Sequence, residues 1–204
     1  VSRNTIFLDC YNQNRKFRKH FLMIYTLTLN PSIDQHITVR KLIPNDKIMP
    51  ENIRLEGGGK GFNVARVIKE LGGETRGFGF SGGHAGNFLK DLLGREKIKH
   101  HLCRIDAETR TNLIIKDRAS GKQTRINPPG PRLHRDDVQR LLDMVEKVAP
   151  RPAFWVLSGS IPPGVPSDIY KRLIKIFQAR GERCVLDTDE EPLKAGLQAK
   201  PFMI

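Results

Sequence analysis

The chain has 204 residues, of which 38% are hydrophobic, 28% charged and 7% aromatic, a composition typical of a soluble globular domain. Its three cysteines include no C-x-x-C pair, which excludes a disulfide scaffold or a cysteine zinc site and favours a cytoplasmic location. The net charge of +13 favours anionic partners, but no nucleic-acid motif and no apolar run of membrane-spanning length occurs, so we expect neither nucleic acid nor a membrane as partner.

The two ends of the chain differ from its middle. Residues 1–22 lack helical and strand periodicity and contain five basic residues against one aspartate, so we expect a disordered basic extension. The folded part is expected over 23–204. The last residues, Lys200–Ile204, resemble the start of a buried strand, from which we expect a truncated chain.

Short apolar runs alternate with amphipathic helices between these ends, which indicates an α/β fold with a mainly parallel sheet. Strands are expected at 24–29, 75–80, 153–157 and 183–187, with a stub at Phe202. Helices are expected at 63–71, 85–93, 136–148 and 191–199, with one more that is capped by Ser167 and ended by Gly181.

Four further segments alternate polar and apolar residues, as half-exposed antiparallel strands do. They are 35–40, 47–56, 111–116 and 123–127. We expect them to form a small antiparallel β lid, from the segments 35–56 and 109–128, that covers a site or pairs with another subunit.

A glycine-rich segment, Glu56–Asn63, leads directly into a helix and reads EGGGKGFN. Glycines let a ligand approach the backbone, and a helix N-terminus offers free N–H groups to an anion. It is not a Walker A loop, because Gly61 follows Lys60 where Ser or Thr is required. We expect a ligand-binding loop; a plain strand-to-helix connection is the alternative.

A second glycine pattern, 77–82, matches G-x-G-x-x-G. Gly77 and Gly79 lie inside the expected strand rather than after it, which does not suit a dinucleotide fingerprint. Structural glycines therefore explain this pattern better than a Rossmann dehydrogenase.

Three polar groups are expected near the edge where ligands bind in open α/β sheets. Asp34 could accept hydrogen bonds from sugar hydroxyls or be a turn aspartate. Arg110 could bind phosphate or lie on the surface. Ser160 follows a core strand in a loop that could be a binding loop or only structural. The histidines show no metal-ligand spacing.

Taken together, these motifs resemble the N-terminal two-thirds of a ribokinase-like carbohydrate kinase of the phosphofructokinase B type. The resemblance rests on the strings IYTLTLNPSID, GGGKGFNVARVIKELGG, ETRTN, INPPGP and WVLSGSIPPGV. It is greatest to the phosphosugar branch, which contains 1-phosphofructokinase, tagatose-6-phosphate kinase and a 6-phosphofructokinase. It implies a three-layer α/β/α fold and ATP-dependent, Mg²⁺-assisted phosphorylation of a ketohexose phosphate, most of all fructose 1-phosphate.

The resemblance also implies roles for individual residues and a partner. Asp34 would hold sugar hydroxyls, and Arg110 would contact the phosphate already on the substrate. Lys47, in a lid strand, would reach the transferred phosphates. Lid-to-lid contact would form a homodimer. The remaining residues implied to bind the sugar are Gly58, Gly59, Asn63 and Ser160.

Two motifs of that family do not occur in the 204 residues: N-x-x-E, which helps to hold Mg²⁺–ATP, and G-x-G-D, which supplies an anion hole and the catalytic base. We therefore assign no catalytic residue and no metal ligand, since the expected base lies beyond Ile204. The chain alone is expected to be inactive, either as part of a kinase or as a non-catalytic sugar-phosphate-binding relic.

Overall fold

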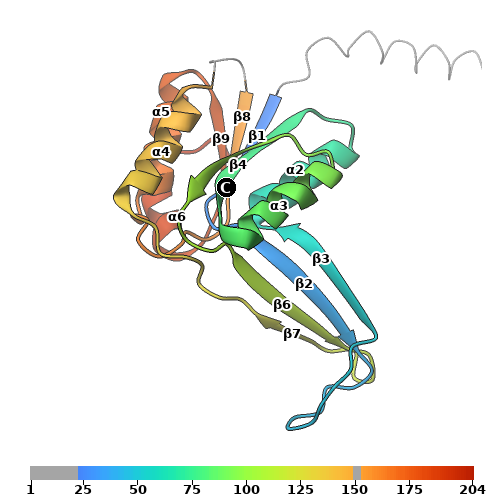
Figure 1. The fold of residues 1–204 in the computed structure, drawn as a ribbon. Coiled ribbons are helices and arrows are strands. Elements are labelled where there is room, and N and C mark those ends of the chain that lie inside the picture. Colours follow the sequence, from blue (N-terminus) through green and yellow to red (C-terminus); the bar gives the residue numbers. More distant parts are fainter. Residues whose placement is uncertain (1–22, 149–152) are drawn as a thin grey trace, which may run out of the picture.

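The computed structural model describes residues 23–148 and 153–204, so the predicted extension 1–22 lies outside the described residues. A five-stranded parallel sheet forms the centre of the molecule, with the strand order β5-β4-β1-β8-β9 (Figure 1). Its strands are β1 (Met23–Thr28), β4 (Thr75–Gly82), β5 (His100–Ile105), β8 (Ala153–Ser158) and β9 (Arg183–Asp187). The four expected core strands are confirmed, whereas β5 was missed because only two of its residues are buried.

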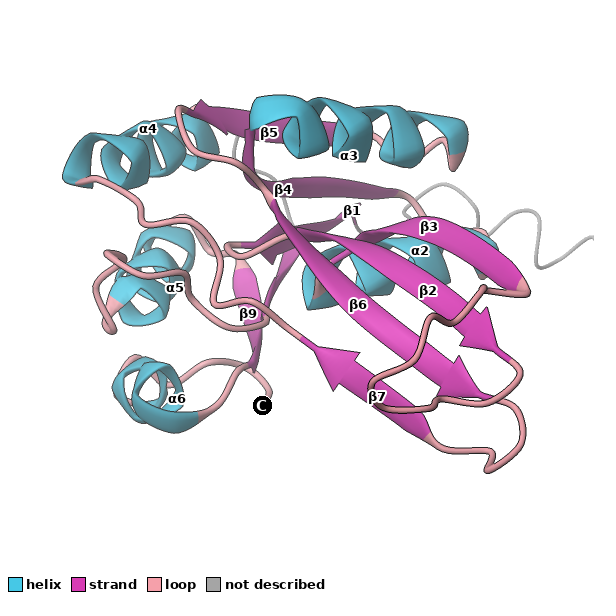
Figure 2. Ribbon diagram, turned by 60° about the horizontal axis from the view of Figure 1, so that its bottom comes forward, coloured by secondary structure: helices cyan, strands magenta, loops and turns pink. Residues whose placement is uncertain are grey.

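Five described helices cover the two faces of this sheet, which confirms the three-layer architecture (Figure 2). One face carries α2 (Lys60–Glu70) and α3 (Gly83–Arg95), and the other carries α4 (Arg135–Glu146), α5 (Ile169–Ala179) and α6 (Glu190–Leu197). The expected cap of α5 at Ser167 is wrong: the helix is preceded by Asp168, whose side chain makes no capping hydrogen bond. Among the described residues no helix has the length and apolarity needed to span a membrane.

The larger part of the hydrophobic core lies between the sheet and the helices α4 and α5. The Trp155 indole is fully buried there and stacks on Phe177, with ring centroids 4.0 Å apart. A smaller core lies under α2 and α3 and contains Phe62. A Cβ atom on Gly77 would lie 2.7 Å from the Phe62 ring, so Gly77 is required for packing of α2 on the sheet.

A second sheet of four strands projects from the core (Figure 1) and has the order β3-β2-β6-β7. Its strands are β2 (Ser32–Val39), β3 (Asn52–Gly58), β6 (Arg110–Asp117) and β7 (Gln123–Ile126). The pair β2–β6 runs parallel, while β2–β3 and β6–β7 run antiparallel. The lid sheet is thus mixed, and the expectation of a purely antiparallel lid is wrong in its central pair.

Lys47 does not lie in a lid strand, contrary to expectation. It lies, exposed, in the connection between β2 and β3 at the far end of the lid (Figure 1). Two prolines, Pro44 and Pro50, and Asn45 with a φ of 61° prevent this segment from continuing a strand.

The expected strand stub near Phe202 is present as a single parallel bridge, which joins Met203 to Val185 of β9. The backbone N–H of Phe202 also donates to the carbonyl of Cys184. The Phe202 ring packs edge-on against Phe154, with centroids 5.4 Å apart.

Candidate functional site

Asp34 lies where the lid sheet joins the core, and its carboxylate is held by two neighbouring side chains. Asp34 Oδ1 accepts hydrogen bonds from Ser32 Oγ at 2.7 Å and from Asn112 Nδ2 at 2.8 Å. Asp34 and Asn112 are register partners on the parallel strands β2 and β6, so the sheet itself sets this contact. Asp34 Oδ2 has no hydrogen-bond partner among the described residues, which leaves it available to a ligand hydroxyl.

The glycine-rich loop packs directly against this carboxylate. A Cβ atom on Gly58 would lie 2.3 Å from Asp34 Oδ1, so no side chain fits at that position. Gly59, with a φ of 114°, is the N-cap residue directly before α2, and this backbone conformation strains any residue other than glycine. Gly58 thus lets the loop backbone lie against the Asp34 carboxylate, and Gly59 lies against Thr28, while the binding of a ligand by this loop stays a prediction.

Arg110, at the start of β6, is anchored by backbone carbonyls and not by an acidic side chain. Its Nη1 donates to the carbonyl of Pro128 at 2.8 Å and its Nη2 to that of Asn30 at 3.0 Å. The buried Nε has no partner. Burial lowers the pKa of Arg110, and the charge of Asp34 opposes that shift. Arg110 is a half-buried cation without an ion pair in the described chain, which suits an anionic ligand.

Asn30 joins three loops around Arg110. Its Nδ2 donates to the carbonyl of Pro129 at 2.9 Å and to Ser160 Oγ at 3.3 Å. Its Oδ1 is buried without a partner. Gly130, with a φ of 96°, approaches this oxygen as closely as Gly58 approaches Asp34. A cavity of about 440 Å³ lies here, with Arg110 and Ser160 both in its wall.

Asn63 is exposed on the first turn of α2 and makes no hydrogen bond to Asp34 or Arg110. Its Oδ1 accepts a bond from Arg66 Nη1 at 2.8 Å, and Arg66 Nη2 donates to the carbonyl of Gly57 at 2.9 Å. Asn63 is thus tied to the glycine-rich loop through Arg66. The structure joins the predicted site residues in one region of the sheet edge except Lys47, which lies at the far end of the lid.

A charged pair beyond the predicted residues lies at the same edge. Asp187 ends β9, and its carboxylate accepts bonds from Ser158 Oγ at 2.6 Å and from Lys60 Nζ at 3.2 Å. The bond from Ser158 lowers the pKa of Asp187 most, burial opposes it, and Lys60 lowers it further. Ser158 and Asp187 are register partners of β8 and β9, so this contact too follows from strand pairing.

Sequence reasoning assigned no role to Asn112, Asn30, Lys60 or Asp187. For Asn112 a signal existed, because it stands two residues after Arg110 on one strand and so shares its face. The contact of Lys60 with Asp187 spans 127 positions and has no local signal.

The described residues contain no group of three or more His, Cys, Asp or Glu side chains that could hold a metal ion.

Comparisons with known proteins identify a family. Residues 20–202 match the profile of the family described as "pfkB family carbohydrate kinase". The Escherichia coli ATP-dependent 6-phosphofructokinase isozyme 2 is 37% identical over 174 residues, which are 85% of this chain and 56% of that protein. A 1-phosphofructokinase of Xanthomonas campestris is 37% identical over 182 residues, 88% of this chain and 57% of that protein.

Solved structures show the same likeness. The crystal structure of E. coli phosphofructokinase-2 in complex with fructose-6-phosphate superposes with a TM-score of 0.82 at 36% identity, covering 87% of this chain and 58% of that one. A structure described as the tetrameric inhibited form of that enzyme gives a TM-score of 0.81 at 37% identity, over 87% and 58% of the two chains. The chain thus spans little more than half the length of these relatives.

Proposed function

The chain belongs to the pfkB family of carbohydrate kinases, and we propose that the whole protein transfers a phosphoryl group from ATP to a ketohexose phosphate. Fructose 1-phosphate is our first candidate substrate, with fructose 6-phosphate and tagatose 6-phosphate as alternatives. The similar relatives include both 1-phosphofructokinases and 6-phosphofructokinases, so their names support the class of substrate and not one member.

The observation that carries this proposal is the set of contacts that the Arg110 side chain makes. Its guanidinium is half-buried beside a cavity and is fixed by two carbonyl groups. Its Nε has no hydrogen-bond partner, and among the described residues the guanidinium forms no ion pair with an acidic side chain. Phosphate would supply the missing negative charge through charge-assisted hydrogen bonds. A substrate bearing both a phosphate and hydroxyl groups matches Arg110 together with the free Oδ2 of Asp34.

The proposal also gives a role to each of the other predicted site residues. Gly58 and Gly59 would offer backbone groups to the sugar, with Gly58 packed against Asp34, while Asn63 and Ser160 would supply polar groups at the borders of the site. Lys47 remains a predicted phosphate contact, and since it lies at the lid's far end it would need to reach a neighbouring subunit's site or move. Phosphoryl transfer depends mainly on such positioning and on charge neutralisation.

We expect the 204-residue chain to bind the sugar phosphate without turning it over. The N-x-x-E and G-x-G-D strings, which the family resemblance links to Mg²⁺–ATP and to the base, do not occur in its sequence. Asp34 does not replace the base in this proposal: its carboxylate, which Ser32 and Asn112 orient, would accept hydrogen bonds from the sugar hydroxyls.

A homodimer formed through the lid is the proposed assembly. One face of the lid exposes Ile53 and Leu55 of β3 and Ile126 of β7. The strand register places these apolar side chains on the same face, opposite to that of Asp34. Burying them against a second copy would remove apolar area from water.

Calorimetric titration of the chain tests the substrate class. We expect fructose 1-phosphate to bind and unphosphorylated fructose to bind at least about tenfold more weakly, since fructose lacks the partner of Arg110. The Arg110→Ala variant should remove this preference, while Lys122→Ala, at an exposed lid turn, should keep it. Equal binding of fructose and its phosphate by the unaltered chain would contradict the proposal.

A further inference from the structure

Asn30 lies just beyond the carboxyl end of β1 and holds two of the proposed site residues at once. Its backbone carbonyl accepts the hydrogen bond from Arg110 Nη2 at 3.0 Å, while its side-chain Nδ2 donates to Ser160 Oγ at 3.3 Å. These partners are 80 and 130 positions away along the chain. One buried residue therefore sets where the Arg110 guanidinium and the Ser160 hydroxyl lie relative to each other.

The orientation of the Asn30 amide follows from its third partner. The backbone carbonyl oxygen of Pro129 lies 2.9 Å from Asn30 Nδ2, and a carbonyl can only accept a hydrogen bond. The atom that faces Pro129 must therefore be the amide nitrogen and not the amide oxygen. This nitrogen carries two hydrogens, of which one is donated to Pro129 and the other to Ser160. Ser160 Oγ is thus the acceptor in its contact with Asn30.

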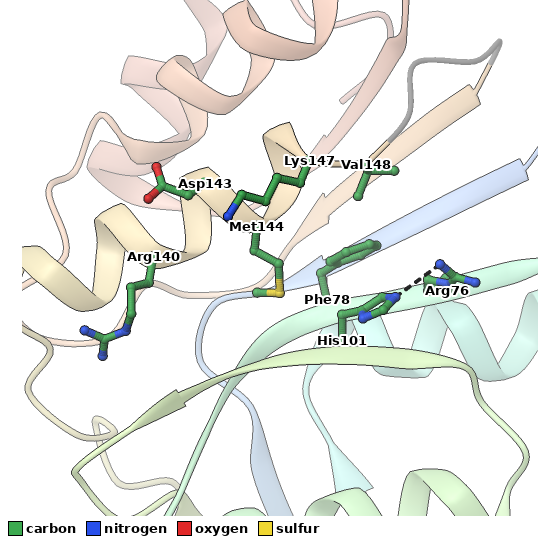
Figure 3. A pocket seen from close by; sticks show the side chains of 8 residues that line it. All are labelled: Arg76, Phe78, His101, Arg140, Asp143, Met144, Lys147 and Val148. Atoms are coloured by element: carbon green, nitrogen blue, oxygen red, sulfur yellow. Dashed lines mark hydrogen bonds between the residues drawn. The ribbon is translucent and has the colours of Figure 1, made fainter.

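The hydroxyl proton of Ser160 is left for another acceptor, and the part of the chain that the structure describes supplies none. Ser160 is exposed and lines the cavity of about 440 Å³ beside Arg110. Among the described residues that line this cavity none is acidic. The larger cavity of about 660 Å³ between α4 and the strands β4 and β5 differs, because its lining includes the carboxylate of Asp143 (Figure 3). The cavity beside Arg110 therefore offers side-chain donors to a ligand that brings the acceptors.

The oxygen of the Asn30 amide, by contrast, has no partner. Asn30 Oδ1 is buried and accepts no hydrogen bond from the residues that the structure describes. Gly130 covers it so closely that a Cβ atom on Gly130 would lie 2.3 Å away. A buried acceptor without a donor costs folding free energy, so stability alone does not favour an asparagine at this position. The contact of its Nδ2 with Ser160 gives another reason for an asparagine here.

We propose that Asn30 is a positioning residue that makes Ser160 a hydrogen-bond donor to the phosphate of the substrate. Asn30 Nδ2 occupies the acceptor side of Ser160 Oγ and so directs the hydroxyl proton into the cavity, while the Asn30 carbonyl places Arg110 at the same cavity. Phosphate brings several acceptor oxygens for these donors and a negative charge for the guanidinium. This inference rests on the proposed function and adds to it the direction of one hydrogen bond and the residue that sets it.

Calorimetric titration with fructose 1-phosphate tests whether Asn30 acts through Ser160. Ser160→Ala, at an exposed position, should weaken binding about tenfold because it removes a hydrogen bond to a charged group. Asn30→Ala should also weaken binding about tenfold. In the Ser160→Ala background, Asn30→Ala should weaken binding by less than about threefold more, because the hydroxyl through which Asn30 acts is already absent. Asn87→Ala, exposed on α3, is the matched control and should bind like the unaltered chain.

Asn30→Asp serves the same comparison where Asn30→Ala does not fold, because aspartate has nearly the same shape as asparagine. An aspartate has no N–H group, so it would accept the Ser160 proton and turn it away from the ligand. Its charge also repels phosphate, but that effect is the same with and without the Ser160 hydroxyl. Asn30→Asp should therefore weaken binding by a factor at least about threefold larger in the chain that retains Ser160 than in Ser160→Ala.

Three results would overturn the inference. The first is binding in Ser160→Ala that equals binding in the unaltered chain. The second is an equal loss on changing Asn30 with and without the Ser160 hydroxyl, because Asn30 would then support the site only as a part of the fold. The third is an unaltered chain that does not bind fructose 1-phosphate, and this result alone would overturn the proposed function as well.

Discussion

Gly58 lies so close to the carboxylate of Asp34 that a Cβ atom on Gly58 would stand 2.3 Å from Oδ1. Gly58→Ala is therefore expected to displace Asp34 and to weaken fructose 1-phosphate binding at least about tenfold, as measured by calorimetry. The Gly94→Ala variant is the control, because a Cβ atom there meets nothing within 4 Å and α3 gains about 0.5–1 kcal/mol of helix stability. Unchanged binding in Gly58→Ala would contradict the assignment of Asp34 to the sugar site.

Asn112 positions Asp34 through a 2.8 Å hydrogen bond. Removing the Asn112 side chain therefore tests whether ligand binding depends on the orientation of the Asp34 carboxylate. We expect Asn112→Ala to weaken sugar-phosphate binding by about 1.5–3 kcal/mol, the value of a hydrogen bond to a charged group. Asn87→Ala, at an exposed position of α3, is the matched control. Binding that is as strong in Asn112→Ala as in the unaltered chain would show that Asp34 needs no such support.

The hydrogen bond from Ser158 holds the pKa of Asp187 below its ordinary value, and Lys60 also lowers it through a hydrogen bond and its charge. A lowered folded-state pKa stabilises the protein fully above the unfolded-state pKa of about 3.9, and this contribution is lost as the pH falls through the folded value. Ser158→Ala should therefore raise the pKa of Asp187, measured by NMR titration, and make stability fall less steeply in acid.

Lys60→Ala provides the comparison for that measurement. It should also raise the pKa of Asp187, because it removes both a hydrogen bond and a positive charge from beside the carboxylate. A larger rise in Lys60→Ala than in Ser158→Ala would show that the ion pair, and not the hydroxyl, controls this carboxylate.

Phe62 fills the core beneath α2, and its ring lies against Gly77, where a side chain would collide with it. Phe62→Ala should lower the free energy of unfolding by about 3–5 kcal/mol, measured by urea denaturation, because a large cavity replaces the ring. Val67→Ala on the same helix is the control, since Val67 is half exposed and should cost under about 1 kcal/mol. A loss of under about 1 kcal/mol in Phe62→Ala would disprove the packing described here.

Phosphoryl transfer itself is expected to be absent from the 204-residue chain. A coupled assay with ATP, Mg²⁺ and fructose 1-phosphate should detect no ADP above background, because the strings linked to the nucleotide and the base do not occur in it. Measurable turnover would show that residues present in this chain supply the base.

The residues that the sequence left unassigned at the site are those whose partners are remote. Asp34 and Arg110 were predicted because each lies in a recognisable motif beside a strand. Asn112 holds the Asp34 carboxylate, and the carbonyls of Asn30 and Pro128 hold the Arg110 guanidinium. Strand pairing and loop packing place these partners, which are remote in the sequence. The loop position of Lys47 was missed because alternation alone does not show that Pro44 and Pro50 interrupt the strand.

Local patterns thus determined the α/β class, the core strands except β5, the helices to within a few residues, and the glycine-rich loop, because hydrophobic periodicity and glycine placement act over short stretches of chain. Pairing between strands decided the rest. The parallel register of β2 with β6 set Asp34 beside Asn112, and that of β8 with β9 set Ser158 beside Asp187. Such contacts join residues that are tens of positions apart, and their geometry exists only once the sheets have formed.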